Sequence, residues 1–405
     1  MLWGIVMGLG FVLSTPLVQP EQIGFASDVY FVATEAFLAG EDPYAVTAPG
    51  TGATFIYPPI TLLAFVPHAL TGSTLGAFVV QLAINLLSAS AIAALVLSML
   101  DRRGVALARI DRLLLVGFVL LSVHSTTVYV MGQVNLQLAL AVALGAMLVE
   151  RGQRESADQG HTLGGAAFAV AAAVKLFPAA AGAWLLGLRD WRAIGGAIGT
   201  GLSLTVAGYL LGGHDLFVTF LSEVLPAETK TADFAGGLAP EAMYVTIRRP
   251  IAALLPSIDP SLYAPLAVIV IAPLVLASYR TLDTGTGRLM ALLATLLGTI
   301  LILPFEAFYF ALLYVPLVPL LYSLDAGAVR RLLAAGTVLL STIVSYEPLT
   351  RWIEMLSLPD GVETAIVDAI GAVLGFAQPP LLGGLCILLA CALWHHDAVT
   401  AEAGA

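Results

Sequence analysis

Residues 77–100 read AFVVQLAINLLSASAIAALVLSML and contain no charged side chain. A helix needs about 20 mostly apolar residues to cross the hydrocarbon core of a bilayer. This stretch meets that length, and it is followed at once by the charged residues Asp101, Arg102 and Arg103. We therefore expect residues 77–100 to form a membrane-spanning helix.

Comparable apolar stretches recur along the whole chain. They lie at residues 1–17, 113–130, 136–149, 193–211, 262–278, 289–303, 308–321, 332–344 and 366–393. Some are shorter than a full span, so the length rule gives roughly 10–13 helical crossings. The sequence predicts an all-α, polytopic membrane protein with a single domain over residues 1–405 and short amphipathic helices in its external loops. We expect residues 1–17 to be a retained first span, because they lack the basic region of a signal peptide.

Composition supports this class of protein. The chain is 59% hydrophobic and only 11% charged, whereas a soluble domain carries roughly a quarter charged residues. Its formal net charge is −10, and Lys175 and Lys230 are the only lysines. The scarcity of basic clusters argues against nucleic acid as a partner. Membrane lipids are the expected surroundings.

The arginines predict the orientation of the chain. They gather in short loops at residues 102–112, 151–154, 189–192, 280–288 and 330–331. The positive-inside rule places such loops in the cytoplasm.

The long polar segments 18–57, 214–260 and 346–363 then face outward. Two places are too short for ordinary spans: residues 58–71, and the pieces 163–174 and 178–188 on either side of Lys175. Broken segments are tolerated where they line a cavity. We therefore expect cavity walls there.

The first external loop, residues 18–57, contains a predicted helix. Ser27 can cap it, with Asp28 in its first turn, and apolar residues from Val29 to Phe37 lie at helical spacing. Gly40 can end it in a left-handed conformation. The pattern predicts a short amphipathic helix lying in the membrane interface.

Asp28 has two interpretations. Partial desolvation could raise its pKa and make it a general base for an incoming hydroxyl. The positive end of the helix dipole acts in the opposite direction, because it favours the anion. Alternatively, Asp28 only caps the helix.

Charged residues in or near the apolar stretches are further candidates. Lys175 could bind the phosphate of a lipid-linked donor, or it could extend to the interface. Arg248 and Arg249 are alternative phosphate ligands, or ordinary loop charges near anionic headgroups. Glu306 is either an acceptor-binding carboxylate at a cavity rim or a carboxylate exposed in a short turn.

Neutral side chains could also contact a substrate. Gln133 and Asn135 suit sugar hydroxyls, or backbone groups freed at a helix break. Tyr44 and Tyr57 could stack on a sugar or a polyprenyl chain, or serve as interfacial tyrosines. The six histidines show no metal-ligand spacing on a common helix, so we expect no structural metal and no cofactor. The sequence leaves open whether a catalytic divalent ion takes part.

Three short blocks of sequence carry recognisable motifs. Residues 24–59 contain the pattern S-D-x-Y-x-x-A-x-x-x-x-L-A-G-x-D-P-Y followed by F-x-Y-P-P. Residues 132–135 read GQVN, and residues 172–178 read AAVKLFP, followed by RDWR at 189–192. In this order the blocks resemble glycosyltransferase family 87, also called the domain-of-unknown-function 2029 family.

The resemblance implies the GT-C fold and a polyprenyl-phosphate sugar donor. The sugar, usually mannose, would pass to a lipid- or glycan-type acceptor at the outer face of the cell membrane. Asp28 would be the general base in a single inverting displacement. The expected donor-phosphate ligands are Lys175, Arg248 and Arg249, and the expected substrate-binding residues are Tyr30, Asp42, Tyr44, Tyr57, Gln133, Asn135, Glu306 and Tyr309.

The second half of the chain differs from the family pattern. Residues 239–249 read APEAMYVTIRR, where the family often has an Asn-Gln-Ser-rich stretch that ends in arginine. Residues 303–310 read LPFEAFYF, where the family often reads S-P-x-S-W-x-H-Y. Tyr309 therefore occupies the histidine position.

A transporter or flippase of lipid-linked saccharides is the alternative function. It would rely on charges at the bilayer midplane, and many such proteins show inverted repeats. No inverted duplication of apolar segments is visible, and the predicted polar features gather at one face. These features favour chemistry on a lipid substrate. A membrane scaffold without activity is the third interpretation.

Overall fold

The computed structural model of the protein describes residues 1–155 and 158–403. Within these ranges the regular structure consists of helices, and the two isolated β-bridges form no strand. The predicted all-α fold is confirmed.

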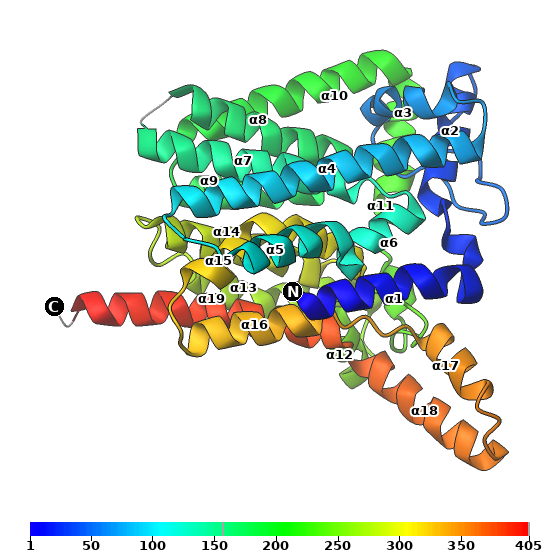
Figure 1. Ribbon diagram of the computed structural model, residues 1–405. Coiled ribbons are helices and arrows are strands. Elements are labelled where there is room, and N and C mark those ends of the chain that lie inside the picture. Colours follow the sequence, from blue (N-terminus) through cyan, green and yellow to red (C-terminus); the bar gives the residue numbers. More distant parts are fainter. Residues whose placement is uncertain (156–157, 404–405) are drawn as a thin grey trace.

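The helices form one elongated bundle whose long members lie side by side (Figure 1). The main helices are α1 (Leu2–Val18), α4 (Thr74–Arg102), α5 (Arg109–Leu121), α6 (Val123–Met131), α7 (Asn135–Glu155), α8 (Asp158–Val174), α10 (Trp191–Thr219), α13 (Tyr263–Ala277), α14 (Gly285–Ile302), α15 (Tyr314–Ser323), α16 (Ala328–Leu340) and α19 (Pro379–Ala403). The remaining α-helices are α2 (Phe25–Leu38), α3 (Leu62–Ala69), α9 (Ala181–Gly187), α11 (Leu225–Ala227), α12 (Arg248–Leu254), α17 (Tyr346–Glu354) and α18 (Asp360–Phe376). α14 lies in the centre, and almost all of its side chains are buried.

Six segments of the described chain are long and apolar enough to cross a membrane. They are Thr74–Arg102, Arg109–Met131, Trp191–Phe234, Pro260–Ala277, Gly285–Ile302 and Gly361–Val399. Four shorter apolar segments accompany them, namely Leu2–Val18, Pro59–Ala69, Phe177–Gly187 and Ala307–Ser323. The total number of crossings stays a prediction, because the shorter segments do not satisfy the length rule alone.

The arginine-rich loops lie together at one end of the bundle, which we call the arginine end. Arg103 Nη2 donates to the carbonyl of Gly285 at 3.0 Å, which joins α4 to α14. Arg288 Nε lies 2.5 Å from Glu150 Oε1, which joins α14 to α7. The predicted grouping of these loops at one face therefore agrees with the fold.

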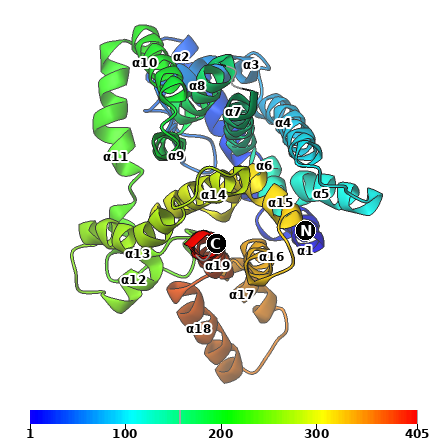
Figure 2. The same ribbon diagram turned by 90° about the vertical axis from the view of Figure 1, so that its left-hand side faces the viewer.

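The long polar segments lie at the opposite end, which we call the loop end. It carries α2, α3, α12 and the pair α17 and α18, which projects away from the bundle in both views (Figures 1 and 2). The isolated bridge between Tyr244 and Glu306 also lies there.

The helix predicted in the first polar loop exists, but two of its details were wrong. It begins at Phe25 after Gly24, which has a φ of +77°, and Ser27 lies inside it and donates to the carbonyl of Gly24 at 2.7 Å. Its predicted end is confirmed, because Gly40 has a φ of +80° directly after Ala39.

The helix also does not present a single apolar face to lipid. Most side chains between Ala26 and Ala36 are buried, and α2 packs on α3 and α4. α2 is therefore part of the packed loop end. The structure differs from the predicted interfacial helix because α2 has buried apolar residues on several faces, including Tyr30 and Phe31.

The two expected breaks are present. α8 ends at Val174, and a 3-10 turn, η3 (Phe177–Ala180), precedes α9, so Lys175 lies in the break. A second 3-10 turn, η2 (Pro59–Thr61), leads into α3. Both turns contain a proline at their start, which cannot donate a helical hydrogen bond.

Glycines bring α8 and α10 into close contact near the N-terminal ends of both helices. A Cβ on Gly165 would lie 1.8 Å from the carbonyl oxygen of Ala193, and one on Gly196 would lie 2.2 Å from that of Thr162. Small residues at helix interfaces allow such close backbone approach in membranes. The position of α10 against α8 therefore depends on these glycines.

We expect Gly165→Ala to destabilise the protein by about 1–3 kcal/mol or more, because an added methyl group overpacks the interface. The measurement is the melting temperature in detergent. Gly195→Ala is the matched control, because a Cβ there meets no atom within 4 Å. Equal melting temperatures for the two variants would contradict this interpretation.

Candidate functional site

The GQVN block forms the turn between α6 and α7. Gly132 has a φ of +66°, and a Cβ there would lie 2.9 Å from Ser27 Oγ. The amide of Gly24 also donates to the carbonyl of Val130 at 2.8 Å. Glycine is required here by both conformation and space, and it allows the start of α2 to contact this turn.

The turn is held from α4 by two buried amides. Gln81 Nε2 and Asn85 Nδ2 each donate to the carbonyl of Gln133 at 3.0 Å. Gln81 also contacts His68 Nε2 at 2.9 Å. Sequence reasoning missed Gln81 and Asn85, although two polar residues four positions apart in an uncharged span were the available signal.

The side chain of Gln133 joins two tyrosines. Its Oε1 accepts from the hydroxyl of Tyr30 at 3.2 Å and from that of Tyr57 at 3.4 Å, and the two hydroxyls lie 2.9 Å apart. Both tyrosines are buried. Three predicted site residues from separate segments are thus brought together.

Lys175 connects this cluster to two further predicted residues. Its Nζ donates to Asn135 Oδ1 at 3.0 Å and to the hydroxyl of Tyr309 at 2.8 Å. It also lies 4.5 Å from the ring centre of Tyr309 and 5.4 Å from that of Tyr57. Hydrogen bonds and aromatic rings therefore stabilise this half-buried cation.

Two glutamates act on Lys175 from a longer distance. Burial lowers the pKa of the Lys175 ammonium, and the charges of Glu306 and Glu228 oppose that shift. Burial raises the pKa of Glu306, and Lys175 opposes it. Glu228 was missed from the sequence, because it stands in a polar loop without any motif.

A cavity of about 310 Å³ opens beside Lys175, and we call it the Lys175 cavity. Its lining includes Tyr57, Lys175, Glu228, Phe305 and Tyr309. The cavity thus combines one lysine and one glutamate with hydroxyl groups, aromatic rings and apolar side chains. Such a surface suits a ligand that has a charged group and a sugar ring.

A second cavity of about 390 Å³, the apolar groove, continues from the first. The two share Pro58, Leu176 and Phe220 in their linings. The rest of the groove is formed mainly by apolar and small residues of α8, α9 and α10, among them Gly201. A cavity that contains charged and hydrogen-bonding side chains therefore joins a groove that is almost entirely apolar, at the break after α8.

Asp28 lies on the first turn of α2 at the loop end. Its carboxylate is half-buried and has no hydrogen-bond or ion-pair partner among the residues described. Burial raises its pKa above the ordinary value for Asp. Asp28 is not in the lining of the Lys175 cavity. However, it stands two residues before Tyr30, whose hydroxyl contacts Tyr57 in that lining.

Asp42 and Tyr44 shape the loop that follows α2. Asp42 Oδ1 accepts from the amide of Tyr44 at 2.9 Å, and the Tyr44 hydroxyl donates to the carbonyl of Tyr57 at 2.8 Å. Both residues therefore support the wall of the Lys175 cavity. Direct contact with a substrate stays a prediction for them.

Arg249 is fully buried, and its donors are engaged by backbone carbonyls. It donates to Leu374 at 2.6 Å and to Tyr244 at 3.3 Å, and it also contacts the carbonyls of Ala239 and Ala242. This arrangement ties the loop before α12 to the end of α18. It favours a structural role over the predicted phosphate-binding role.

Arg248 is bound less completely. Nε donates to the carbonyl of Ile302 at 2.7 Å, and Nη1 donates to that of Thr229 at 3.2 Å. Within the described chain, Nη2 has no hydrogen-bond partner. Because Thr229 lines the Lys175 cavity, Arg248 stays a candidate phosphate ligand.

We expect Arg249→Met to destabilise the protein by more than about 3 kcal/mol, because a buried carbonyl left unpaired costs about 1–3 kcal/mol. Arg248→Met is the matched comparison and should lose less stability, because it frees two carbonyls. The melting temperatures of both variants in one detergent give the measurement. An Arg249→Met protein that melts at the parent temperature would contradict the structural role.

Comparison with known proteins supplies one match. The model of glycosyltransferase family 87 matches residues 55–305, more than half of the chain. The matched region includes Tyr57, the GQVN turn, Lys175 and Arg248, whereas Asp28 and Tyr309 lie outside it. Neither a curated protein nor a solved structure matches the chain. The chain belongs to glycosyltransferase family 87 and is a multi-pass membrane glycosyltransferase.

Proposed function

We propose that the enzyme transfers a hexose, with mannose as the first candidate, from a polyprenyl-phosphate donor to a lipid- or glycan-type acceptor. The supporting observation is the Lys175 cavity, which has a cation and aromatic rings and continues into the apolar groove. A polyprenyl-phosphate sugar has the same division into polar and apolar parts. We expect a GT-C fold. The site would lie at the outer membrane face, because it is at the opposite end of the bundle from the arginine end, which the positive-inside rule places in the cytoplasm.

The donor phosphate would bind at Lys175. When the glycosidic bond to phosphate breaks, negative charge develops on the leaving phosphate, and a fixed cation stabilises that charge. Arg248 could add a donor through Nη2 across the cavity. Tyr309 accepts a hydrogen bond from Lys175 and thereby fixes the ammonium position.

The polyprenyl chain would lie in the apolar groove. Gly201 lines the groove, and a Cβ there meets no atom within 4 Å, so the position has room for a larger side chain. Each buried methylene group contributes about 0.8 kcal/mol to binding. Part of the donor affinity should therefore depend on this surface.

We expect Gly201→Leu to raise the KM for a long-chain donor about tenfold, the equivalent of roughly two lost methylene contacts. A donor with a short, water-soluble chain should be affected much less. Steady-state kinetics with both donors give the measurement. Gly199→Leu is the control, because Gly199 also has open space but is absent from the groove lining. Equal effects on both donors would reject the groove as the chain site.

Asp28 would act as the general base. Its carboxylate would remove the proton from the acceptor hydroxyl as that oxygen attacks the anomeric carbon. The bond from this carbon to the phosphate oxygen breaks in the same step, so the configuration inverts and polyprenyl phosphate leaves. An unpaired and partly desolvated carboxylate suits this role, because its raised pKa makes it a better base.

We expect Asp28→Asn to lower the transfer rate about 10²–10⁴-fold, the usual contribution of a general base, while the melting temperature stays near that of the parent. The assay follows labelled sugar from a polyprenyl-phosphate donor into product. Glu35→Gln is the control, because Glu35 is exposed on the same helix. Full transfer by Asp28→Asn would remove Asp28 from the mechanism.

The same assay has a pH dependence with a defined sign. The base must be deprotonated, and burial raises the pKa of Asp28. The rate should therefore fall, as pH is lowered, at a higher pH than for an ordinary Asp with a pKa of about 3.9.

A further inference from the structure

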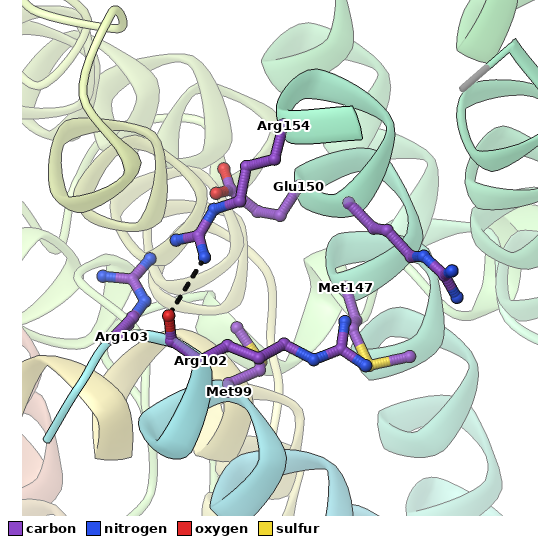
Figure 3. Close-up of a pocket in the computed structure, with 7 residues that line it drawn as sticks. Met99, Arg102, Arg103, Met147, Glu150 and Arg154 are labelled. Atoms are coloured by element: carbon purple, nitrogen blue, oxygen red, sulfur yellow. Dashed lines mark hydrogen bonds between the residues drawn. The ribbon is translucent and has the colours of Figure 1, made fainter. Parts of the chain in front are cut away.

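A separate cavity of about 460 Å³ lies at the arginine end, between the C-terminal ends of α4 and α7 (Figure 3). We call it the arginine cavity. Its lining consists of Met99, Arg102, Arg103, Met147, Glu150, Arg151 and Arg154. The volume lies within the range of about 300–1,000 Å³ that is common for ligand sites. No step of the proposed transfer reaction uses it.

The lining carries an excess of positive charge. Four of its seven residues are arginines, and Glu150 is its single acid. Glu150 is already paired with Arg288, through Oε1 at 2.5 Å and Oε2 at 3.1 Å. The ends of α4 and α7 add a partial negative charge of about half an elementary charge each. This is less than the charge of Arg102, Arg103 and Arg154 alone, with Arg151 left out of the balance.

Backbone contacts hold two of the arginines at the wall. Arg103 Nη2 donates to the carbonyl of Gly285 at 3.0 Å, and Arg154 Nη1 donates to that of Arg102 at 3.4 Å (Figure 3). A guanidinium group has five N–H donors, so each keeps others for a ligand. A ligand would therefore meet donors that are already positioned.

The positive-inside rule alone does not explain why these arginines gather around one cavity. At the same end, Arg112 lies 3.2 Å from Asp101, and Arg192 lies 2.6 Å from Asp158. In contrast, Arg102 and Arg154 form no ion pair in the part of the chain that the structure covers. Arg103 is affected by the charge of Glu150, but that carboxylate is bonded to Arg288. Like charges that face one cavity repel each other, and an anion between them would remove that repulsion.

We propose that the arginine cavity binds a phosphate group. Planar guanidinium groups bind phosphate in a bidentate manner, and the cavity is lined by arginines from the ends of two helices. The phosphate can belong to the headgroup of an anionic lipid, since basic pockets between membrane helices bind such headgroups, or to a free ion. The site lies at the opposite end from Lys175, so the proposal does not depend on the proposed function.

The test compares two double variants of the full-length protein. Arg102→Gln with Arg154→Gln removes two charges from the cavity. Arg112→Gln with Arg192→Gln removes two charges from the same end but leaves the lining unchanged. Melting temperatures of all proteins without ligand show whether each variant is folded.

The lipid arm uses nanodiscs of phosphatidylglycerol and phosphatidylcholine, with native mass spectrometry of the extracted protein. We expect the parent and the control to retain phosphatidylglycerol, and the cavity variant to retain about tenfold less, the loss expected for weakened charge-assisted hydrogen bonds. This result supports the lipid headgroup as the source of the phosphate.

The free-ion arm titrates inorganic phosphate against the protein in detergent and follows the melting temperature at constant ionic strength. A rise for the parent and control that is lost in the cavity variant supports a soluble source. If the cavity variant and the control behave alike in both arms, the proposal is overturned. A parent that binds neither probe overturns it as well.

Discussion

The half-buried ammonium group of Lys175 organises the loop end of this protein. Lys175 stands in the break between α8 and η3, and its Nζ is held by Asn135 at the start of α7 and by Tyr309 after α14. A cation inside an apolar bundle is costly unless it is paired or functional. Tyr57, whose ring also lies beside Nζ, donates to Gln133, and the backbone carbonyl of Gln133 accepts from two amides of α4. The break, the turn and the cavity are therefore parts of one arrangement.

The features that depend on local sequence could be predicted. Uncharged stretches such as residues 77–100 gave the helices, because burial of apolar side chains and internal hydrogen bonding leave few alternatives in a bilayer. Gly40 ended α2 as expected, since only a residue tolerant of positive φ fits there. The break at Lys175 was also expected, because a charge and a proline interrupt an apolar run.

The features that depend on tertiary contacts could not be predicted. One donor of Arg249 goes to the carbonyl of Leu374, which is far away in the sequence, and no pattern around Arg249 indicates this partner. Glu228 reaches the Lys175 cavity from a loop without a motif. α2 begins at Phe25 and not at the expected cap, Ser27, because the amide of Gly24 bonds to the carbonyl of Val130 in another helix. In each case the deciding partner is remote in sequence.

The choice of partners for Lys175 bears directly on the chemistry. If a carboxylate were bonded to Nζ, the positive charge would be neutralised inside the protein, and a phosphate would find little attraction. The bonded partners are instead the neutral groups of Asn135 and Tyr309. Glu228 and Glu306 act only from a longer distance, where they favour the charged form of the lysine. Burial nevertheless lowers the pKa of Lys175 to about 7. A bound phosphate would itself favour the charged ammonium, and that charge is what stabilises a phosphate leaving group.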